Sequence, residues 1–246
     1  MTRLRSAMGL STPDRVVVRG QDLVRDVMGR LDLGAFAFLE IWGREPTPGE
    51  AVVFNACLAT LVEHGMTPQA MAARLTYLGA PESIQGAVAA GLLGLGSRFG
   101  GGAEAAARML QDAVREGADA AGIVGRFRAA RQPIPGLGHP IHKPEDPRTP
   151  RLFAIAREHG LDGTHAGLMR EVAAEAAKER PLPLNATGAL GAVLSDLGLD
   201  WRLCRGIAVI GRAVGLVGHI AEELRDPIAR TLWERTEAEV SEQDAG

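Results

Sequence analysis

The chain has 246 residues, of which 46% are hydrophobic and only 4% aromatic, and its formal net charge at pH 7 is −3. This length can bury the core of one large domain or of two modest ones. Charges of both signs are mixed along the chain, which therefore lacks the basic surface that binds nucleic acid or an anionic membrane. A phosphate-bearing ligand must be held by a local basic cluster.

The two cysteines, Cys57 and Cys204, each lie in an apolar, helix-like run. Two cysteines are too few for a disulfide framework, so we expect buried free thiols. The N-terminal apolar run is too short for a signal peptide, and no segment has about 18 uninterrupted apolar residues, so no membrane span is expected. The composition predicts a soluble, cytoplasmic protein.

Hydrophobic residues recur at helical spacing along most of the chain, after one short β-like run at Val16–Val18. Two helices have clear starts, because Thr47-Pro48 and Thr67-Pro68 each supply an N-cap and a first turn. The alternation typical of strands is almost absent, which predicts an all-α fold. The expected helices cover 22–31, 35–42, 48–64, 68–76, 81–90, 103–116, 118–131, 151–159, 163–180, 189–196, 201–225 and 227–237.

A proline-rich loop, residues 132–150, interrupts this helical pattern and carries His139 and His142. Loops held between rigid helices are frequent places for binding and catalytic residues. Two histidines three residues apart could bind a metal on a helix, but Pro140 and Pro144 exclude a helix here. No third ligand stands at a recognisable spacing, so no metal site is expected.

The glycines of this loop suggest a second interpretation. Gly136 and Gly138 allow tight turns that point N–H groups into one concavity, as in phosphate-binding nests. Lys143 and Arg148 could then neutralise phosphates. An ordinary surface turn with solvated charges fits the same spacing, and the residues alone leave both interpretations open.

Two further stretches carry residues of interest. The glycine-rich residues 94–102 follow a helix rather than a strand, which excludes a dinucleotide-binding fingerprint and leaves close packing or a hinge at Gly100–Gly102. Arg212 and His219 lie two helical turns apart in an apolar helix and point the same way. Such an arginine needs an anion, either a structural glutamate or a substrate carboxylate, whereas His219 fits a core histidine.

Four stretches of the chain resemble the citrate synthase superfamily, and specifically its citryl-CoA lyase branch, which includes the lyase module of ATP-citrate lyase. GLGHPIHKPEDPR is similar to the superfamily's GxGHxxxxxxDPR loop, and VIGRAVGLVGHIAEE to its C-terminal substrate-arginine helix. GLLGLGSRFGGGAEAA is similar to the lyase branch's glycine-rich segment, with Phe99 where citrate synthases carry a histidine. GREPTPGEAVVFNACLATLVEHG also fits this branch, and the likeness spans residues 14 to 235.

The resemblance implies an all-α, citrate synthase-like homodimer in which coenzyme A binds in a cleft between two helical domains. The large domain would comprise residues 1–99 and 207–246. The small domain would comprise residues 100–206, including the catalytic loop 132–150, and would close over the substrate.

The resemblance also implies roles for particular residues. His139 would be catalytic: it would hydrogen-bond the substrate's central oxygen and, in the cleavage direction, accept the proton of the tertiary alcohol. Arg212 would clamp a substrate carboxylate, and Arg225 would bind a second one from the partner subunit. His142, three residues after His139 in the same loop, is a further candidate for binding the substrate. The residues that would contact coenzyme A are Gly136, Leu137, Gly138, Lys143 and Arg148.

Three positions depart from the family's pattern. Thr187 stands where lyases carry a catalytic aspartate, Ala72 where they carry a histidine, and Pro140 where the loop usually has an arginine. The aspartate handles the proton on the acetyl carbon, and the missing histidine stabilises the enolate. Losing either type of group typically costs about a hundred-fold or more in rate. His142, His64, Thr187 or backbone N–H groups are the possible replacements.

These expectations favour a carbon–carbon lyase that cleaves a 3-hydroxyacyl-CoA, citryl-CoA by default, to acetyl-CoA and a 2-oxo acid, oxaloacetate. A condensing enzyme that acts on another acyl-CoA is the alternative from the same class. Because of Ala72 and Thr187, a non-catalytic member that binds coenzyme A or a carboxylate is the alternative from a different class.

Overall fold

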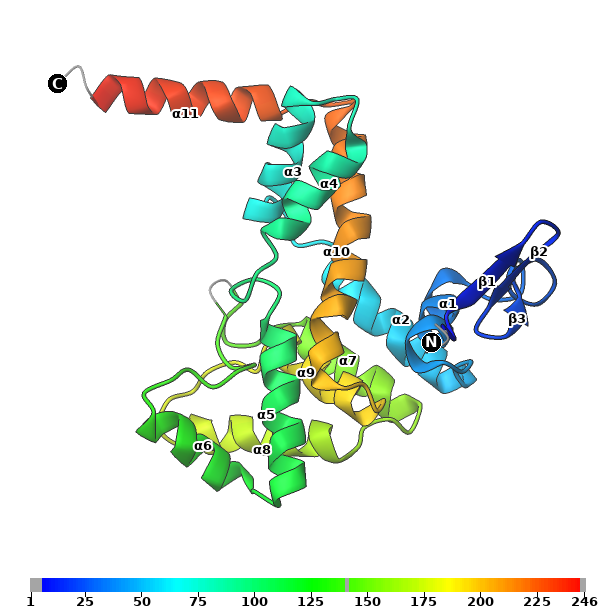
Figure 1. Ribbon diagram of the computed structural model, residues 1–246. Helices are drawn as coiled ribbons and strands as arrows, with labels where there is room; N and C mark the ends of the chain where they lie inside the picture. The colour runs from blue at the N-terminus through cyan, green and yellow to red at the C-terminus, as the bar shows by residue number, and fades with distance from the viewer. Residues whose placement is uncertain (1–5, 140–141, 244–246) are drawn as a thin grey trace, which may run out of the picture.

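The computed structural model describes residues 6–139 and 142–243. Figure 1 shows a chain built almost entirely of helices. The helices are α1 (Leu33–Trp42), α2 (Pro48–Val62), α3 (Pro68–Gly79), α4 (Ile84–Leu93), α5 (Gly102–Glu116), α6 (Ala120–Ala129), α7 (Arg148–Glu158), α8 (Thr164–Ala177), α9 (Ala186–Asp196), α10 (Trp201–Glu223) and α11 (Ala229–Gln243). The expected all-α fold is confirmed.

The N-terminal part differs from the expectation. Three short antiparallel strands, β1 (Gly9–Thr12), β2 (Arg15–Val18) and β3 (Gln21–Asp22), form a small sheet in that order. The helix predicted for 22–31 is only a five-residue π-helical turn, Leu23–Val27. The reason is that β3 pairs with β2 up to Asp22, and Gly29 then takes a positive φ of 78° that ends the helical path.

The main core lies among α5 to α9 and receives side chains from α1, α2 and α10. Helices α5 and α9 lie very close, because Gly191 of α9 faces the backbone of α5. A Cβ on Gly191 would stand 2.7 Å from the carbonyl oxygen of Ala103 and 2.7 Å from the nitrogen of Ala107. Small residues thus set the spacing in a core with few aromatic rings.

Helix α10 crosses α2 with equally little space. A Cβ on Gly211 would stand 2.8 Å from the Leu58 carbonyl oxygen, and one on Gly215 only 1.9 Å from that of Val62. The two glycines flank Arg212 on α10. Close packing therefore brings Arg212 to the C-terminal end of α2.

By length and composition alone, α10 could cross a membrane, since an 18-residue window in it has a mean hydropathy of 1.4. This finding differs from the expectation based on uninterrupted apolar runs. However, 44% of that window is buried inside the structure, and the core helix of a soluble protein meets the same criterion. The helix packs against α2, α5, α3 and α4.

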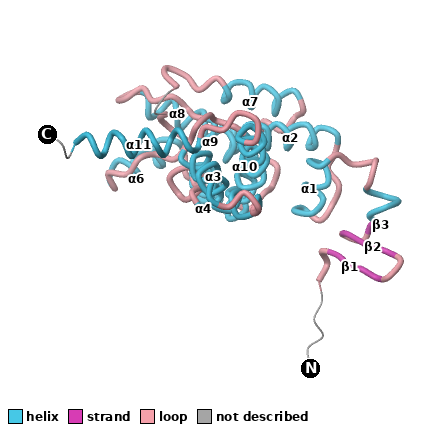
Figure 2. The backbone as a smooth tube through the Cα atoms, turned by 90° about the horizontal axis from the view of Figure 1, so that it is seen from above, coloured by secondary structure: helices cyan, strands magenta, loops and turns pink. Residues whose placement is uncertain are grey.

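The views in Figures 1 and 2 place the small sheet at one end of the molecule and α11 at the other. Helices α3 and α4 pack beside the C-terminal half of α10, α11 contacts α3 and extends away from it, and α5 to α9 lie near the N-terminal half of α10. The boundary predicted at residue 206 falls within the continuous helix α10. The division into a large and a small domain stays a prediction.

Candidate active site

Three histidines from two distant parts of the sequence meet at the loop 132–150. His64 follows the end of α2, and His139 and His142 belong to the loop between α6 and α7. The ring centroids of His139 and His142 are 4.4 Å apart, and His64 lies 5.7 Å from each of them. All three residues are partly buried.

The loop fixes the tautomer of His139. The backbone N–H of His142 donates a hydrogen bond of 2.9 Å to Nδ1 of His139. Burial lowers the pKa of His139, with a smaller contribution from His142, which keeps the ring neutral near pH 7. A neutral imidazole that accepts at Nδ1 carries its hydrogen on Nε2. His139 is therefore arranged to donate a hydrogen bond from Nε2, whereas the resemblance assigned it a proton-accepting role.

Arg148 is held by the aspartate two residues before it. Nε and Nη2 of Arg148 lie 3.0 and 2.9 Å from the carboxylate of Asp146, which also accepts the backbone N–H of Ala186 at 2.9 Å. Burial opposes the charged carboxylate, but these bonds outweigh burial and lower the pKa of Asp146 to about 2. Asp146 thereby joins the start of α7 to the start of α9 and aims Arg148.

Burial is the main cause that lowers the pKa of His64, His139 and Arg212, and the charge of Arg148 adds to it in all three. The resemblance assigned Arg148 to coenzyme A phosphates. Its position instead groups it with the histidines and with Arg212, and its paired Nε and Nη2 leave Nη1 for a ligand. The charges of Arg148 and Arg212 thus both act on His64.

Arg212 is 9% exposed, and burial lowers its pKa. Its Nε and Nη1 are buried and make no hydrogen bond to any described residue. The nearest carboxylate is that of Glu63, whose Oε2 lies 3.9 Å from Nη1, too far for a hydrogen bond. A buried guanidinium with unpaired N–H groups is costly unless an anion binds it. Arg212 is therefore prepared for an anionic ligand.

Behind Arg212 lies a structural network of charged residues. His219 is buried, with Nε2 3.0 Å from the Glu63 carboxylate and Nδ1 3.2 Å from Nε of Arg74. Arg74 is fully buried and is paired with both Glu222 and Glu223. The expected core role of His219 agrees with these contacts, and the sequence pattern had not indicated Arg74 or Glu63.

The glycines of the loop serve mainly to anchor it. Gly136 packs directly on Gly188, since a Cβ on Gly136 would stand 2.6 Å from Cα of Gly188. Gly138 donates its N–H to Pro183 at 2.7 Å, and its carbonyl oxygen accepts from Nδ2 of Asn185 at 2.6 Å. Both glycines have positive φ, at 86° and 84°. Much of the backbone assigned to coenzyme A is thus paired within the chain.

The other candidates are dispersed. Leu137 forms an isolated β-bridge with Leu184, Lys143 is exposed, and Arg225 is exposed just beyond the end of α10. Pro140 lies outside the described residues.

The positions that depart from the family pattern offer no replacement base. The Thr187 hydroxyl donates to Oδ1 of Asn185 at 2.7 Å. The same hydroxyl packs against Gly102, where an added Cβ would stand 2.6 Å from it. Ala72 lies in α3 and brings no polar group. Gly100, Gly101 and Gly102 are all closely packed, as one of the two interpretations of this segment expected.

The sequence reasoning against a metal site missed the third imidazole. One nitrogen each from His64, His139 and His142 lie within 4.8 Å of one another, a ligand set that zinc can use. Two features oppose a cation here. Nδ1 of His139 accepts a hydrogen bond, so Nε2 carries hydrogen, and the charges of Arg148 and Arg212 act on the same space.

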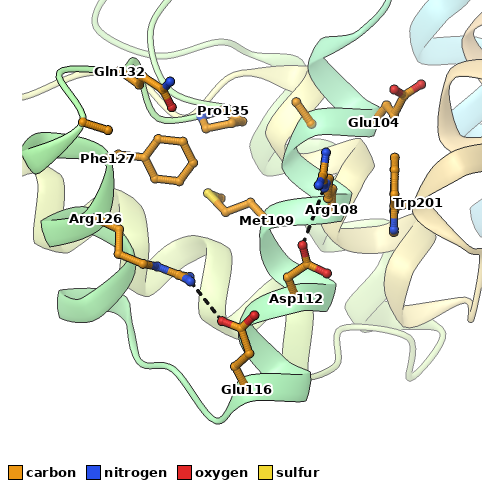
Figure 3. Close-up of a pocket in the computed structure, with 12 residues that line it drawn as sticks. Glu104, Arg108, Met109, Asp112, Glu116, Arg126, Phe127, Gln132, Pro135 and Trp201 are labelled. Atoms are coloured by element: carbon orange, nitrogen blue, oxygen red, sulfur yellow. Dashed lines mark hydrogen bonds and ion pairs between the residues drawn. The ribbon is translucent and has the colours of Figure 1, made fainter.

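A separate cavity of about 530 Å³ lies between α5, α6 and the start of α10, and Pro135 at its rim adjoins the loop glycines. Figure 3 shows Phe127 and Met109 at its centre and two ion pairs along its edge. Arg126 pairs with Glu116 at 2.9 Å, and Arg108 with Asp112 at 3.6 Å. The cavity walls therefore carry carboxylates beside both arginines.

Residues 19–233 match the family model described as the C-terminal domain of citrate synthase. The chain belongs to the citrate synthase family. Within the family, it is 36% identical to citryl-CoA lyase from Hydrogenobacter thermophilus, with a TM-score of 0.85 over 91% of this chain and 88% of that one. It is 26% identical to ATP citrate lyase from Methanothrix soehngenii, solved with citrate and coenzyme A, with a TM-score of 0.80 over 92% and 39% of the two chains.

A curated relative is the probable ATP-citrate synthase of Dictyostelium discoideum, 28% identical over 200 residues and 74% of this chain. The chain spans about a third of that relative's length, 32%. The recognition of the citrate synthase superfamily and its lyase branch from sequence is confirmed. The roles of individual residues rest on the geometry above.

Proposed function

We propose that this chain is a citryl-CoA lyase-like carbon–carbon lyase that cleaves citryl-CoA to acetyl-CoA and oxaloacetate. The observation that carries the proposal is Arg212, a buried guanidinium whose Nε and Nη1 make no hydrogen bond to any described residue. It shares its site with Arg148 and three imidazoles. Such a set suits a compact ligand with several carboxylates, as the citryl group is.

The tautomer of His139 supports a reaction in the cleavage direction. Cleavage turns the substrate's tertiary alcohol into a ketone, so negative charge develops on that oxygen as its proton leaves. The Nε2–H of neutral His139 can donate to this oxygen throughout the reaction and stabilise the charge. His139 then acts as an electrophile, as a neutral imidazole does when its pKa is lowered.

Coenzyme A is the second part of the proposal. The ATP citrate lyase from Methanothrix soehngenii, similar in fold over nearly the whole of this chain, was solved with coenzyme A. We place the coenzyme along the segment Gly136–Gly138, with exposed Lys143 available for a phosphate. Arg148 is assigned to the substrate instead. We propose that no metal takes part.

A coupled assay of oxaloacetate release from citryl-CoA tests the activity. We expect turnover by the wild-type chain and a loss of roughly 100-fold or more in kcat for His139→Ala. The control is His159→Ala, a change at an exposed histidine at the end of α7. Absence of wild-type turnover, or equal turnover by His139→Ala, would contradict the proposal.

A non-catalytic binder is the second candidate, because Thr187 and Ala72 cannot perform acid–base chemistry. Calorimetry with coenzyme A separates the two: binding without turnover on a broad acyl-CoA panel favours the binder. A condensing enzyme acting on another acyl-CoA would reveal itself in the same panel when a 2-oxo acid is added.

The proposed assembly comes from the resemblance, and the proposed location from the composition. We propose a homodimer, to which Arg225 of one subunit would contribute at the site of the other, and a cytoplasmic location. Support for an interface comes from the apolar groove of about 610 Å³ between α3 and α11, where Trp233 is 54% exposed.

A further inference from the structure

The proposed reaction needs a base that the assigned residues do not supply. His139 donates from Nε2, so it is the wrong tautomer to take the alcohol's proton. Thr187 donates its hydroxyl to Asn185, and Asp146 is fully committed to Arg148 and Ala186. A retro-aldol cleavage proceeds only when the hydroxyl proton has an acceptor.

Two imidazoles remain near His139, namely His64 and His142. Burial lowers the pKa of His64, and the charges of Arg148 and Arg212 oppose a further positive charge there. The ring of His142 is the nearer of the two to His139, at 4.4 Å against 5.7 Å between centroids. Its own backbone N–H fixes the His139 tautomer, which couples the positions of the two rings.

We propose that His142 is the catalytic residue that moves the proton in the lyase reaction, taking the place of the carboxylate that is absent at Thr187. Its imidazole takes the proton from the substrate hydroxyl, and the electron pair of that O–H bond becomes the second bond of the ketone. The bond between the carbinol carbon and the acetyl CH₂ breaks, and its electron pair passes to the thioester as an enolate.

The same imidazolium then returns the proton to the CH₂ carbon, which becomes the methyl group of acetyl-CoA. No proton is consumed or released overall. The oxygen and the CH₂ group are bonded to the same carbon, so one side chain can reach both. His139 donates to the oxygen throughout, while Arg148 and Arg212 hold the carboxylates. This assignment rests on the proposed lyase activity.

The test replaces the side chain while keeping the backbone N–H that orients His139. We expect His142→Gln and His142→Gly to lose about 100-fold or more in kcat on citryl-CoA, with KM changed less than about threefold. Added imidazole should restore at least about tenfold of that loss in His142→Gly but not in His142→Gln, where the side chain fills the space. His159→Gln, at an exposed position, should match the wild type.

A second measurement follows the carbon proton directly. In D₂O with oxaloacetate present, NMR should show exchange of the acetyl-CoA methyl protons by the wild type and none by His142→Gln. Circular dichroism verifies that each variant is folded.

Several results would overturn the assignment. They are an unchanged kcat in His142→Gln, a slow His142→Gly that imidazole does not restore, or methyl exchange that persists in His142→Gln. Inactivation of the wild type by a chelator with recovery on adding Zn²⁺ would make His142 a metal ligand and overturn it too. A wild type without turnover would overturn the proposed function itself, and this assignment with it.

Discussion

Arg212 and Arg74 show how burial can serve either function or stability, depending on the partners of the charge. Arg74 is fully buried and is paired with Glu222 and Glu223. Arg212 is nearly as buried, yet its Nε and Nη1 make no hydrogen bond to the described residues. The first arrangement stabilises the fold, and the second keeps a binding site at the expense of stability.

We predict that Arg212→Met lowers kcat/KM for citryl-CoA by on the order of 100-fold, because a carboxylate loses its buried partner. The same change should leave the free energy of unfolding unchanged or raise it by about 1 kcal/mol, since an incompletely paired buried charge is removed. Steady-state kinetics and urea unfolding measure the two effects. A clear loss of stability would show that Arg212 is structural.

For Arg74→Met, in contrast to Arg212→Met, we predict a loss of stability. The carboxylate of Glu223, 6% exposed, would lose its charged partner and keep only the backbone N–H groups of Ile228 and Ala229, so the free energy of unfolding should fall by about 3–5 kcal/mol. Urea unfolding beside Arg212→Met provides the comparison. Equal stability of the two variants would contradict this distinction.

Asp146 gives a prediction on pH. Its pKa in the folded chain, about 2, lies below the usual value of about 3.9. A lowered folded-state pKa contributes stability that is complete above the unfolded value and disappears as pH falls through the folded one. We expect Asp146→Asn to cost about 2 kcal/mol at pH 7, and this difference to shrink between about pH 4 and pH 2. Urea unfolding across that range checks it, and a constant difference would contradict it.

At the scale of secondary-structure elements, the crossing of α10 and α2 decides the geometry of the site. Gly211 and Gly215 allow the two backbones to approach, and this approach sets Arg212 opposite Glu63. The helical pattern of α10 could be predicted from the sequence. The need for glycine at these two positions could not, because it arises from the Leu58 and Val62 carbonyl groups of another helix.

We predict that Gly215→Ala destabilises the chain by about 1–3 kcal/mol or more, because the new Cβ would stand 1.9 Å from the Val62 carbonyl oxygen. The matched control is Gly218→Ala in the same helix, where nothing lies within 4 Å. That change should stabilise by about 0.5–1 kcal/mol, since alanine is the better helix former. Thermal unfolding measures both, and equal effects would rule out the tight crossing.

At the scale of the whole molecule, light scattering tests the proposed homodimer. We expect a mass of about twice the 26.0 kDa of one chain. Because binding to the folded state alone stabilises it, coenzyme A at about 100 times its Kd should add about 2.7 kcal/mol to the free energy of unfolding. A mass of 26.0 kDa would refute the dimer. A melting temperature that coenzyme A leaves unchanged would contradict the proposed coenzyme A site.

The sequence by itself determined the helical class, most helix starts, the family and the loop that carries His139. These features depend on local signals: the period of hydrophobic residues, Thr-Pro caps and an ordered set of motifs. The N-terminal sheet was missed, since β3 is only two residues long and depends on pairing with β2.

Only the tertiary structure decided which residues share the site. His64 joins His139 and His142 from a distant part of the chain, the charge of Arg148 acts on Arg212, and the N–H of His142 sets the tautomer of His139. Such relations depend on how α2, α7 and α10 pack and on which hydrogen bonds the loop can make. No local pattern encodes them, because each requires two segments that meet only in the folded chain.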